Sequence, residues 1–272
     1  PHPPEALGPR YVAALGGMYA DRIRLIGTEA GLGVNLRGVV DAMSGSLTLT
    51  TDGRLVQAGR LNALDAIDVR ARDGIAHTGT TYAQRDVALS SPGGIENAGV
   101  VAAGNALALD AAALTSTGTL AAGVDTTGVL GTAGTLRVDV AGTAALGGSQ
   151  LASGGDLAIT AAGMDLATAR VFAGRTAALA ATARDIDARD ATVDAGGELR
   201  LNAARALRND DGLLRGVTLV VDAATLDNGR GRIDQTGPGG LGVLQMQSGR
   251  VVGGQGGGNA PLRPGAGGGL QQ

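Results

Sequence analysis

A four-residue pattern recurs along the chain: an apolar residue, a variable residue, a second apolar residue and then a polar one. Leu199-Arg-Leu-Asn202 is one copy, and Leu47-Thr-Leu-Thr50 is another. The nine first positions are Leu47, Ile67, Val87, Leu107, Leu136, Leu157, Leu179, Leu199 and Leu219. Their successive spacings are 20, 20, 20, 29, 21, 22, 20 and 20 residues. A period this short and this regular predicts a solenoid.

The alternation within each copy predicts a β-strand with one buried face. The first and third positions are apolar and lie on the same side of a strand. The residue between them varies freely, as Asp68, Ala108 and Arg200 show, so we assign that position to the outer surface. The fourth position is polar in all nine copies. We therefore expect the chain to leave the buried face there.

A turn and a second short strand are expected to follow each copy. The turn is expected six residues after each first position, at Gly53, Asp73, Gly93, Ala113, Gly142, Gly163, Asp185, Arg205 and Thr225. Six of these nine residues are Gly or Asp, which favour turns because Gly adopts positive φ and Asp bonds to its own backbone. Most copies then place an apolar residue one or two positions later: Leu55, Ile75, Ile95, Leu114, Met164, Ile186, Leu207 and Leu226. Each copy is thus interpreted as strand, turn, strand and a further turn or short strand.

A single copy cannot bury its apolar face, so the copies are expected to stack. Circuits about 4.8 Å apart pair equivalent strands in parallel, and the handedness of parallel crossovers predicts right-handed winding. A leucine-rich repeat has a similar period, but it requires a recurring Asn and a helical return segment, and neither occurs in the sequence. The predicted fold class is all-β, a right-handed parallel β-helix (solenoid) of roughly 20-residue coils.

The pattern divides the chain into four parts. Residues 1–18 are a lead-in, residues 19–46 form the first coils, residues 47–236 form the main β-helix, and residues 237–272 are a Gly-rich tail that we expect to be disordered. The 29-residue interval places a surplus of about nine residues within 118–134. We interpret it as a loop that bulges from one coil, on a scaffold where loops often carry recognition. The start Pro1-His-Pro-Pro4 has no initiator Met, so we expect a segment of a longer polypeptide.

Composition supports thin, uniform layers and excludes several classes of site. The chain has 48 Gly, 3 Tyr, 1 Phe and no Trp, so Ala, Val, Leu and Gly must fill its interior. It has no Cys, which excludes disulfides and thiolate sites. All 22 basic residues are Arg, which excludes a Walker lysine and a Schiff-base lysine. The net charge is −3 and the charges are scattered, so no nucleic-acid partner is expected. No apolar run is long enough to span a membrane.

The sequence offers few candidates for chemistry, and we reject each of them. Residues 237–242 fit G-x-G-x-x-G but have neither the leading strand nor the following helix of a dinucleotide site, and residues 253–258 lack the Asp of a calcium-binding repeat. The acidic run Asp185, Asp187, Asp190 and Asp194 is interleaved with Arg184 and Arg189, and we interpret it as solvated outward positions. The two histidines are His2 in the lead-in and His77, which we expect to be an exposed turn residue. We predict no catalytic, cofactor-binding or metal-binding residues and no cofactor.

One stretch resembles a known family. Tyr19-Ala-Asp-Arg-Ile-Arg-Leu-Ile-Gly-Thr-Glu-Ala-Gly-Leu-Gly-Val34 is similar to the segment near the end of the secretion domain in the filamentous haemagglutinin family of Gram-negative two-partner secretion exoproteins. The coils that follow are similar to its haemagglutinin repeats, so the resemblance covers residues 11 to about 236. On this basis residues 19–46 are the end of a secretion-domain-like segment. The Asn-Pro motifs that begin the family's secretion domain are absent.

The resemblance implies a β-helical shaft segment of a secreted or surface-displayed adhesin, lying outside the outer membrane and mediating attachment or presenting a distal tip. The implied partners are an outer-membrane two-partner secretion transporter, for the full-length protein, and a receptor or glycan on a host or neighbouring cell. The alternatives are the stalk of a contact-dependent growth inhibition toxin and a β-helix carbohydrate-active enzyme. An enzyme of that kind would need clustered acids and aromatic sugar platforms, and the chain has only four aromatic residues, so we expect no enzyme activity.

Overall fold

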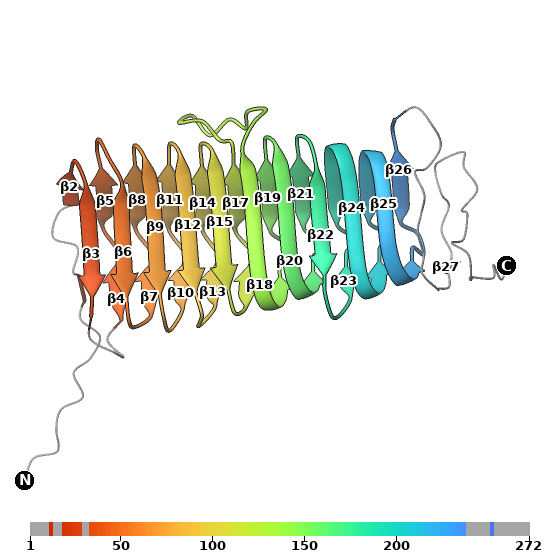
Figure 1. Cartoon of the computed structure of the whole chain (residues 1–272), viewed down its shortest axis with the longest axis horizontal. Coiled ribbons are helices and arrows are strands. Elements are labelled where there is room, and N and C mark those ends of the chain that lie inside the picture. The colour runs from red at the N-terminus through yellow and green to blue at the C-terminus, as the bar shows by residue number, and fades with distance from the viewer. Residues whose placement is uncertain (1–10, 13–17, 29–32, 238–250, 253–272) are drawn as a thin grey trace, which may run out of the picture.

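The chain folds into an elongated parallel solenoid. The structure, a computed structural model, describes residues 11–12, 18–28, 33–237 and 251–252, and in these residues β-strands are the only regular elements longer than a turn. Each coil contributes strands to three walls, and every pairing between named strands is parallel (Figure 1). The predicted all-β solenoid is confirmed.

The first wall contains the repeated apolar pattern. Its separate strands are β3 (Ile23–Gly27), β6 (Leu47–Thr51), β9 (Ala66–Ala71), β12 (Asp86–Ser91), β15 (Ala106–Ala111) and β22 (Ala177–Ala181). Two longer strands, β18 (Thr135–Ala145) and β20 (Asp156–Asp165), run from the first wall into the second. β24 (Thr192–Arg208) and β25 (Leu213–Asp227) run through all three walls.

The second and third walls are built from shorter strands. The second wall has β1 (Tyr11–Val12), β4 (Val34–Leu36), β7 (Leu55–Gln57), β10 (Ile75–His77), β13 (Ile95–Asn97), β16 (Leu114–Ser116), β23 (Ile186–Asp187) and β27 (Val251–Val252). The third wall has β2 (Met18–Ala20), β5 (Val39–Ala42), β8 (Arg60–Ala63), β11 (Thr80–Ala83), β14 (Val100–Ala103), β17 (Thr119–Ala122), β19 (Gln150–Ser153), β21 (Arg170–Ala173) and β26 (Arg232–Gln235).

The core is a stack of aligned apolar side chains. In the first wall one inward position is occupied in turn by Ile23, Leu47, Ile67, Val87, Leu107, Leu136, Leu157, Ala177, Leu199 and Leu219. From Leu47 onward none of these side chains is more than 1% exposed. The second-wall apolar residues predicted from the sequence, such as Leu55, Ile75 and Met164, are buried as well. Nine steps of about 4.8 Å make this stack roughly 43 Å long.

Two details of the first-wall pattern differ from the sequence interpretation. Ala177, not Leu179, is the first position of its copy, since Ala177 pairs with Leu157 and Leu179 pairs with Ile159. The polar fourth position therefore holds Ala180 in that copy. The buried face also does not end at the fourth position: Thr51 and its equivalents in the following coils are buried. Each strand thus carries three inward residues because its alternation continues for one more step.

The corner between the first and second walls changes along the shaft. The predicted turns at Gly53, Asp73 and Gly93 lie between separate strands. The turns predicted at Gly142 and Gly163 were wrong, since both residues lie within long strands that bend at this corner. The same holds for the turns predicted at Arg205 and Thr225, which lie inside β24 and β25. A register shift between Val140 and Thr143 absorbs the bend.

The surplus residues form a loop that begins later in the sequence than expected. Thr119–Ala122 is a regular third-wall strand paired with β14 and β19, so the extra residues are 123–134. We call residues 123–134 the insertion loop. It replaces the two-residue connection Gly104-Asn105 of the preceding coil, because Ala106 and Thr135 are register partners. Figure 1 shows the loop projecting beyond one edge of the walls, above β17 and β18.

The strand pairing continues across the expected boundary between residues 46 and 47. Ile23 pairs with Leu47, so residues 19–46 share the coil geometry of the residues that follow. Most of the lead-in 1–18 and most of the tail 237–272 lie outside the described residues, as do the two glycine patterns apart from Gly237. In the described residues no helix is long and apolar enough to cross a membrane.

Candidate functional site

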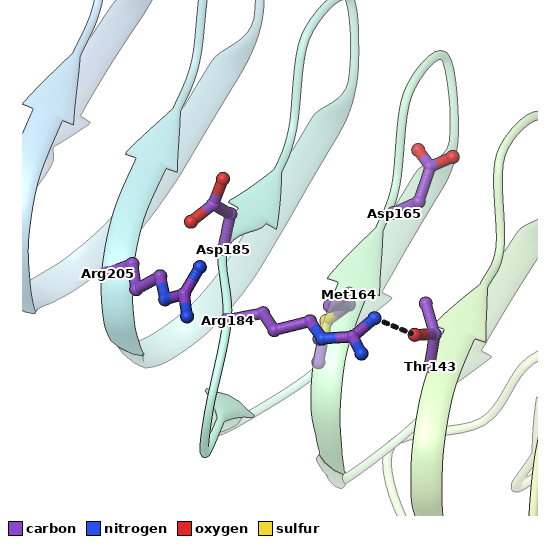
Figure 2. A pocket seen from close by; sticks show the side chains of 7 residues that line it. Thr143, Met164, Asp165, Arg184, Asp185 and Arg205 are labelled. Atoms are coloured by element: carbon purple, nitrogen blue, oxygen red, sulfur yellow. Dashed lines mark hydrogen bonds between the residues drawn. The ribbon is translucent and has the colours of Figure 1, made fainter.

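A hollow at the corner between the first and second walls contains charged side chains of opposite sign. It has a volume of about 220 Å³ and is lined by Thr143, Gly163, Met164, Asp165, Arg184, Asp185 and Arg205. Figure 2 shows Arg184 and Arg205 extending along the shaft in the same direction, with Arg184 donating to Thr143 Oγ1 at 3.4 Å. A Cβ on Gly163 would lie 3.0 Å from Arg184 Cβ, so this glycine leaves room for the arginine.

The charges in this hollow balance one another. Asp185 accepts from the Ala206 amide at 3.2 Å and forms an ion pair with Arg208 at 2.9 Å. Asp165 accepts from the Ala167 amide at 2.9 Å. Two guanidinium groups and two carboxylates therefore share the hollow. Because the lining carries two charges of each sign, it offers no surface of a single sign to an anion or a cation.

The acidic run does not form one cluster, because its members lie on different walls. Asp185 and Asp187 lie at the second wall, Asp190 lies in the next turn, and Asp194 lies in the third-wall part of β24. Hydrogen bonds from Arg189 hold the pKa of the Asp187 carboxyl below its usual range. Asp194 lies 3.6 Å from Arg215. In the described part of the chain no group of three or more His, Asp or Glu side chains is arranged to hold a metal ion.

His77 is buried, so its expected exposure was wrong. It occupies an inward position of the second wall with 2% exposure, in one column with Gln57, Asn97 and Ser116. Its Nδ1 lies 2.8 Å from Asn97 Oδ1, and its Nε2 lies 3.0 Å from Thr81 Oγ1. Asn97 in turn donates to Ser116 Oγ at 3.1 Å. The interior accepts these polar groups because neighbouring coils supply their hydrogen-bond partners.

Acidification is expected to destabilise the shaft through His77. Burial lowers the pKa of this imidazole below its ordinary value, so the unfolded chain takes up a proton before the folded chain does. Stability should therefore fall as the pH drops through about 6.5 and keep falling until the folded-state pKa is reached. The variant His77→Asn places the neighbouring coil's residue in this column. Urea midpoints at pH 7.5 and pH 5 should differ less for His77→Asn than for the wild type, and equal differences would contradict the assignment.

The insertion loop is tied to the third wall and to itself. Asp125 Oδ1 accepts from the amides of Thr127 and Val129 at 2.8 and 2.9 Å and from Thr127 Oγ1 at 2.7 Å. These bonds lower the pKa of the Asp125 carboxyl, the Thr127 hydroxyl contributing most. Val124 forms an antiparallel bridge with Leu130. Tyr82 donates from its hydroxyl to the Val124 carbonyl at 3.2 Å. These contacts constrain the conformation of the loop.

A groove of about 430 Å³ lies between the insertion loop and the third wall. Its lining is Tyr82, Gln84, Gly104, Gly123, Val124, Asp125, Thr126, Val129, Gly131, Thr132 and Ala133. The loop was predicted from the sequence, but Tyr82 and Gln84, which lie two coils before it, were not. No local signal marks them: Tyr82 is one of only four aromatic residues, but Tyr19 and Phe172 are also exposed and do not line the groove.

Comparison with known proteins identifies the repeats. The sequence model of the haemagglutinin repeat matches residues 8–59, 42–130, 131–184 and 171–237. The tRNA nuclease CdiA-2 of Burkholderia pseudomallei is 34% identical over 203 residues, which is 75% of this chain and 6% of the relative. Toxin CdiA of Yersinia pestis is 45% identical over 26% of this chain and 2% of the relative. The tRNA nuclease CdiA of Yersinia mollaretii is 39% identical over 46% of this chain and 4% of the relative.

These matches cover only a small part of each relative, whereas the repeat model covers most of this chain. No solved structure gives a significant match. The matched residues are the coils whose aligned Leu, Ile and Val side chains build the solenoid, so the resemblance predicted over residues 11 to about 236 is confirmed. The chain belongs to the haemagglutinin-repeat family of filamentous-haemagglutinin-like exoproteins.

Proposed function

We propose that this segment is a spacer in the stalk of a contact-dependent growth inhibition toxin, holding a distal part of the protein away from the cell that displays it. The observation that carries the proposal is the unbroken register of the first wall from Ile23 to Leu219. Each coil of such a stack lengthens the shaft, and this role requires no catalytic group. The names of the relatives, nucleases and toxins of the CdiA type, favour a toxin stalk over the adhesin shaft suggested by the first resemblance.

The segment is proposed to contribute length rather than catalysis. A nuclease needs groups that converge on a scissile bond, but the acidic side chains of the described coils are distributed over outward positions and mostly face arginines. The nuclease activity named for the relatives is therefore assigned to parts of the protein other than these coils. A carbohydrate-active enzyme would also require convergent acids, and Asp185, Asp187 and Asp194 do not converge.

The whole protein is proposed to be exported by an outer-membrane two-partner secretion transporter and to recognise a receptor or glycan on a neighbouring cell. Family membership supports secretion or display at the cell surface. The parallel coil is also compatible with this route, because each coil pairs with the one before it and can fold in order as the chain emerges.

Removing one whole coil tests the spacer role in the full-length exoprotein. Deletion of residues 47–66 joins Ser46 to Ile67 and keeps the register, because Leu47 and Ile67 are partners. Deletion of residues 47–56 removes half a coil and puts every later side chain out of register. We expect the first variant to be displayed and to inhibit target cells as the parent does, and the second to lose display. A whole-coil variant that is displayed normally but no longer inhibits target cells would refute the spacer role.

A further inference from the structure

The groove under the insertion loop has the chemistry of a sugar site, and we propose that it binds a neutral oligosaccharide. This inference does not depend on the spacer role, but it rests on the glycan recognition proposed above and gives it a site and a sugar class. A solenoid that only adds length has no need of a 12-residue ordered insertion where its neighbouring coil uses the two residues Gly104-Asn105. Ordering those extra residues costs conformational entropy, so the loop calls for a role of its own.

The floor of the groove is an aromatic ring held in place. Tyr82 lies at an outward position of β11, and the bond from its hydroxyl to the Val124 carbonyl fixes the ring. The next residues in the same outward column are Ala102, Ala121 and Ala152, whose small side chains leave space for Val124 and Leu130 to pack against the wall. The ring therefore forms part of the apolar floor of an open depression. A flat, apolar surface of this size suits the C–H face of a pyranose ring.

The rim of the groove carries hydrogen-bonding groups. Gln84 is exposed beside Tyr82, and Thr126 and Thr132 contribute hydroxyls from the loop. Asp125 uses Oδ1 for its bonds within the loop, and in the described structure no side chain or amide donates to Oδ2. An amide, two hydroxyls and a carboxylate oxygen offer both donors and acceptors, which is what the vicinal hydroxyls of a sugar require.

The charge of the groove decides between sugar classes. The chain has 22 arginines, yet no basic side chain is found among the described residues that line the groove. The single charged group is the Asp125 carboxylate, whose lowered pKa keeps it ionised in mildly acidic solution. An acidic sugar would meet repulsion with no compensating cation. The groove therefore favours a neutral oligosaccharide over a sulfated or carboxylated one.

The size of the groove and the pairing of its strands argue against a protein partner. A volume of about 430 Å³ lies in the range of small-molecule sites, roughly 300–1,000 Å³, whereas a stable protein interface needs about 800 Å² on each partner. A peptide could add as a strand only at a free sheet edge. β11, β14 and β17 are each paired on both sides, so the third wall has no such edge there.

Calorimetric titration of the 272-residue chain tests the proposal with maltotriose, cellotriose and chitotriose as neutral probes and trigalacturonate as an acidic one. We expect at least one neutral trisaccharide to bind and trigalacturonate not to bind. Tyr82→Ala should weaken that binding about tenfold or more, as expected for loss of a central aromatic contact, whereas Tyr82→Phe should retain it. Replacing residues 123–134 by Gly-Asn copies the preceding coil's connection and should abolish binding while leaving the melting curve of the shaft in place.

Phe172 provides a matched control. It lies in the same outward column as Tyr82, is 41% exposed, and does not line the groove. Phe172→Ala should therefore leave trisaccharide binding unchanged. The proposal is overturned if none of the neutral trisaccharides binds, if trigalacturonate binds more tightly than they do, if Phe172→Ala weakens binding as much as Tyr82→Ala, or if the variant without the loop still binds.

Discussion

The variant Leu157→Asp is expected to lose its folded stack. Leu157 is 1% exposed and lies in β20 between its partners Leu136 and Ala177. A carboxylate at this position would be buried among apolar side chains with no partner for its charge. Together with the lost apolar contacts, this should cost at least about 4 kcal/mol, which places it among the most severe single substitutions. Far-ultraviolet circular dichroism and urea unfolding would measure the loss.

Two substitutions at outward positions of the first wall serve as controls for Leu157→Asp. Ala158→Asp puts the same side chain one residue later, on the outer face of the same strand, and Arg200→Asp does so two coils further on. Both side chains reach water, so a carboxylate there keeps its hydration. Their unfolding midpoints should stay close to that of the parent chain. If Leu157→Asp unfolded at the same urea concentration as Ala158→Asp, the division into inward and outward positions would be wrong.

The solenoid could be predicted from the sequence because every coil solves the same packing problem. A buried position between two equivalent layers accepts a narrow range of side-chain volumes, so Leu, Ile and Val recur there at a fixed period. The copy at Ala177 was missed because alanine departs from this recurrence. Alanine also fits the inward position. Leu179, the next inward residue of the same strand, therefore matched the pattern as the first position of this copy, although it pairs with Ile159 and not with Leu157.

The polar interior could not be predicted from a rule that places polar residues outside. His77, Asn97 and Ser116 are buried because they are stacked, and hydrogen bonds between neighbouring coils join His77 to Asn97 and Asn97 to Ser116. These partners are about twenty residues apart in sequence, so only alignment of the coils would reveal them. The extent of the insertion loop was also misjudged, since Gly118 lies at a corner of the stack and Thr119–Ala122 continue the wall.

The candidate groove was accessible from the sequence only in part. The 29-residue interval marked the coil with the loop, and a surplus of residues on a rigid scaffold is a direct signal of an exposed feature. The floor of the groove was not accessible in this way, because Tyr82 lies about forty residues before the loop and reaches it only through the stacking of β11, β14 and β17. The separation of Asp185 from Asp194 onto different walls follows from the same geometry: a coil turns a corner within a few residues.

Gly79→Ala is the second substitution for which we expect a large loss of stability. Gly59, Gly79, Gly99 and Gly118 occupy one column at the corner between the second and third walls, and a Cβ on Gly79 would overlap the carbonyl oxygen of Gly59. That oxygen accepts from the Thr80 amide at 3.0 Å, so it cannot move away without weakening a bond between coils. Steric strain of about 1–3 kcal/mol together with a hydrogen bond of about 1 kcal/mol predicts a loss of roughly 2–4 kcal/mol.

Gly38→Ala is the control, since no atom of the described chain lies within 4 Å of a Cβ there. Urea midpoints should fall for Gly79→Ala and stay near the parent value for Gly38→Ala, and equal midpoints would show that the corner is not closed by glycine contacts.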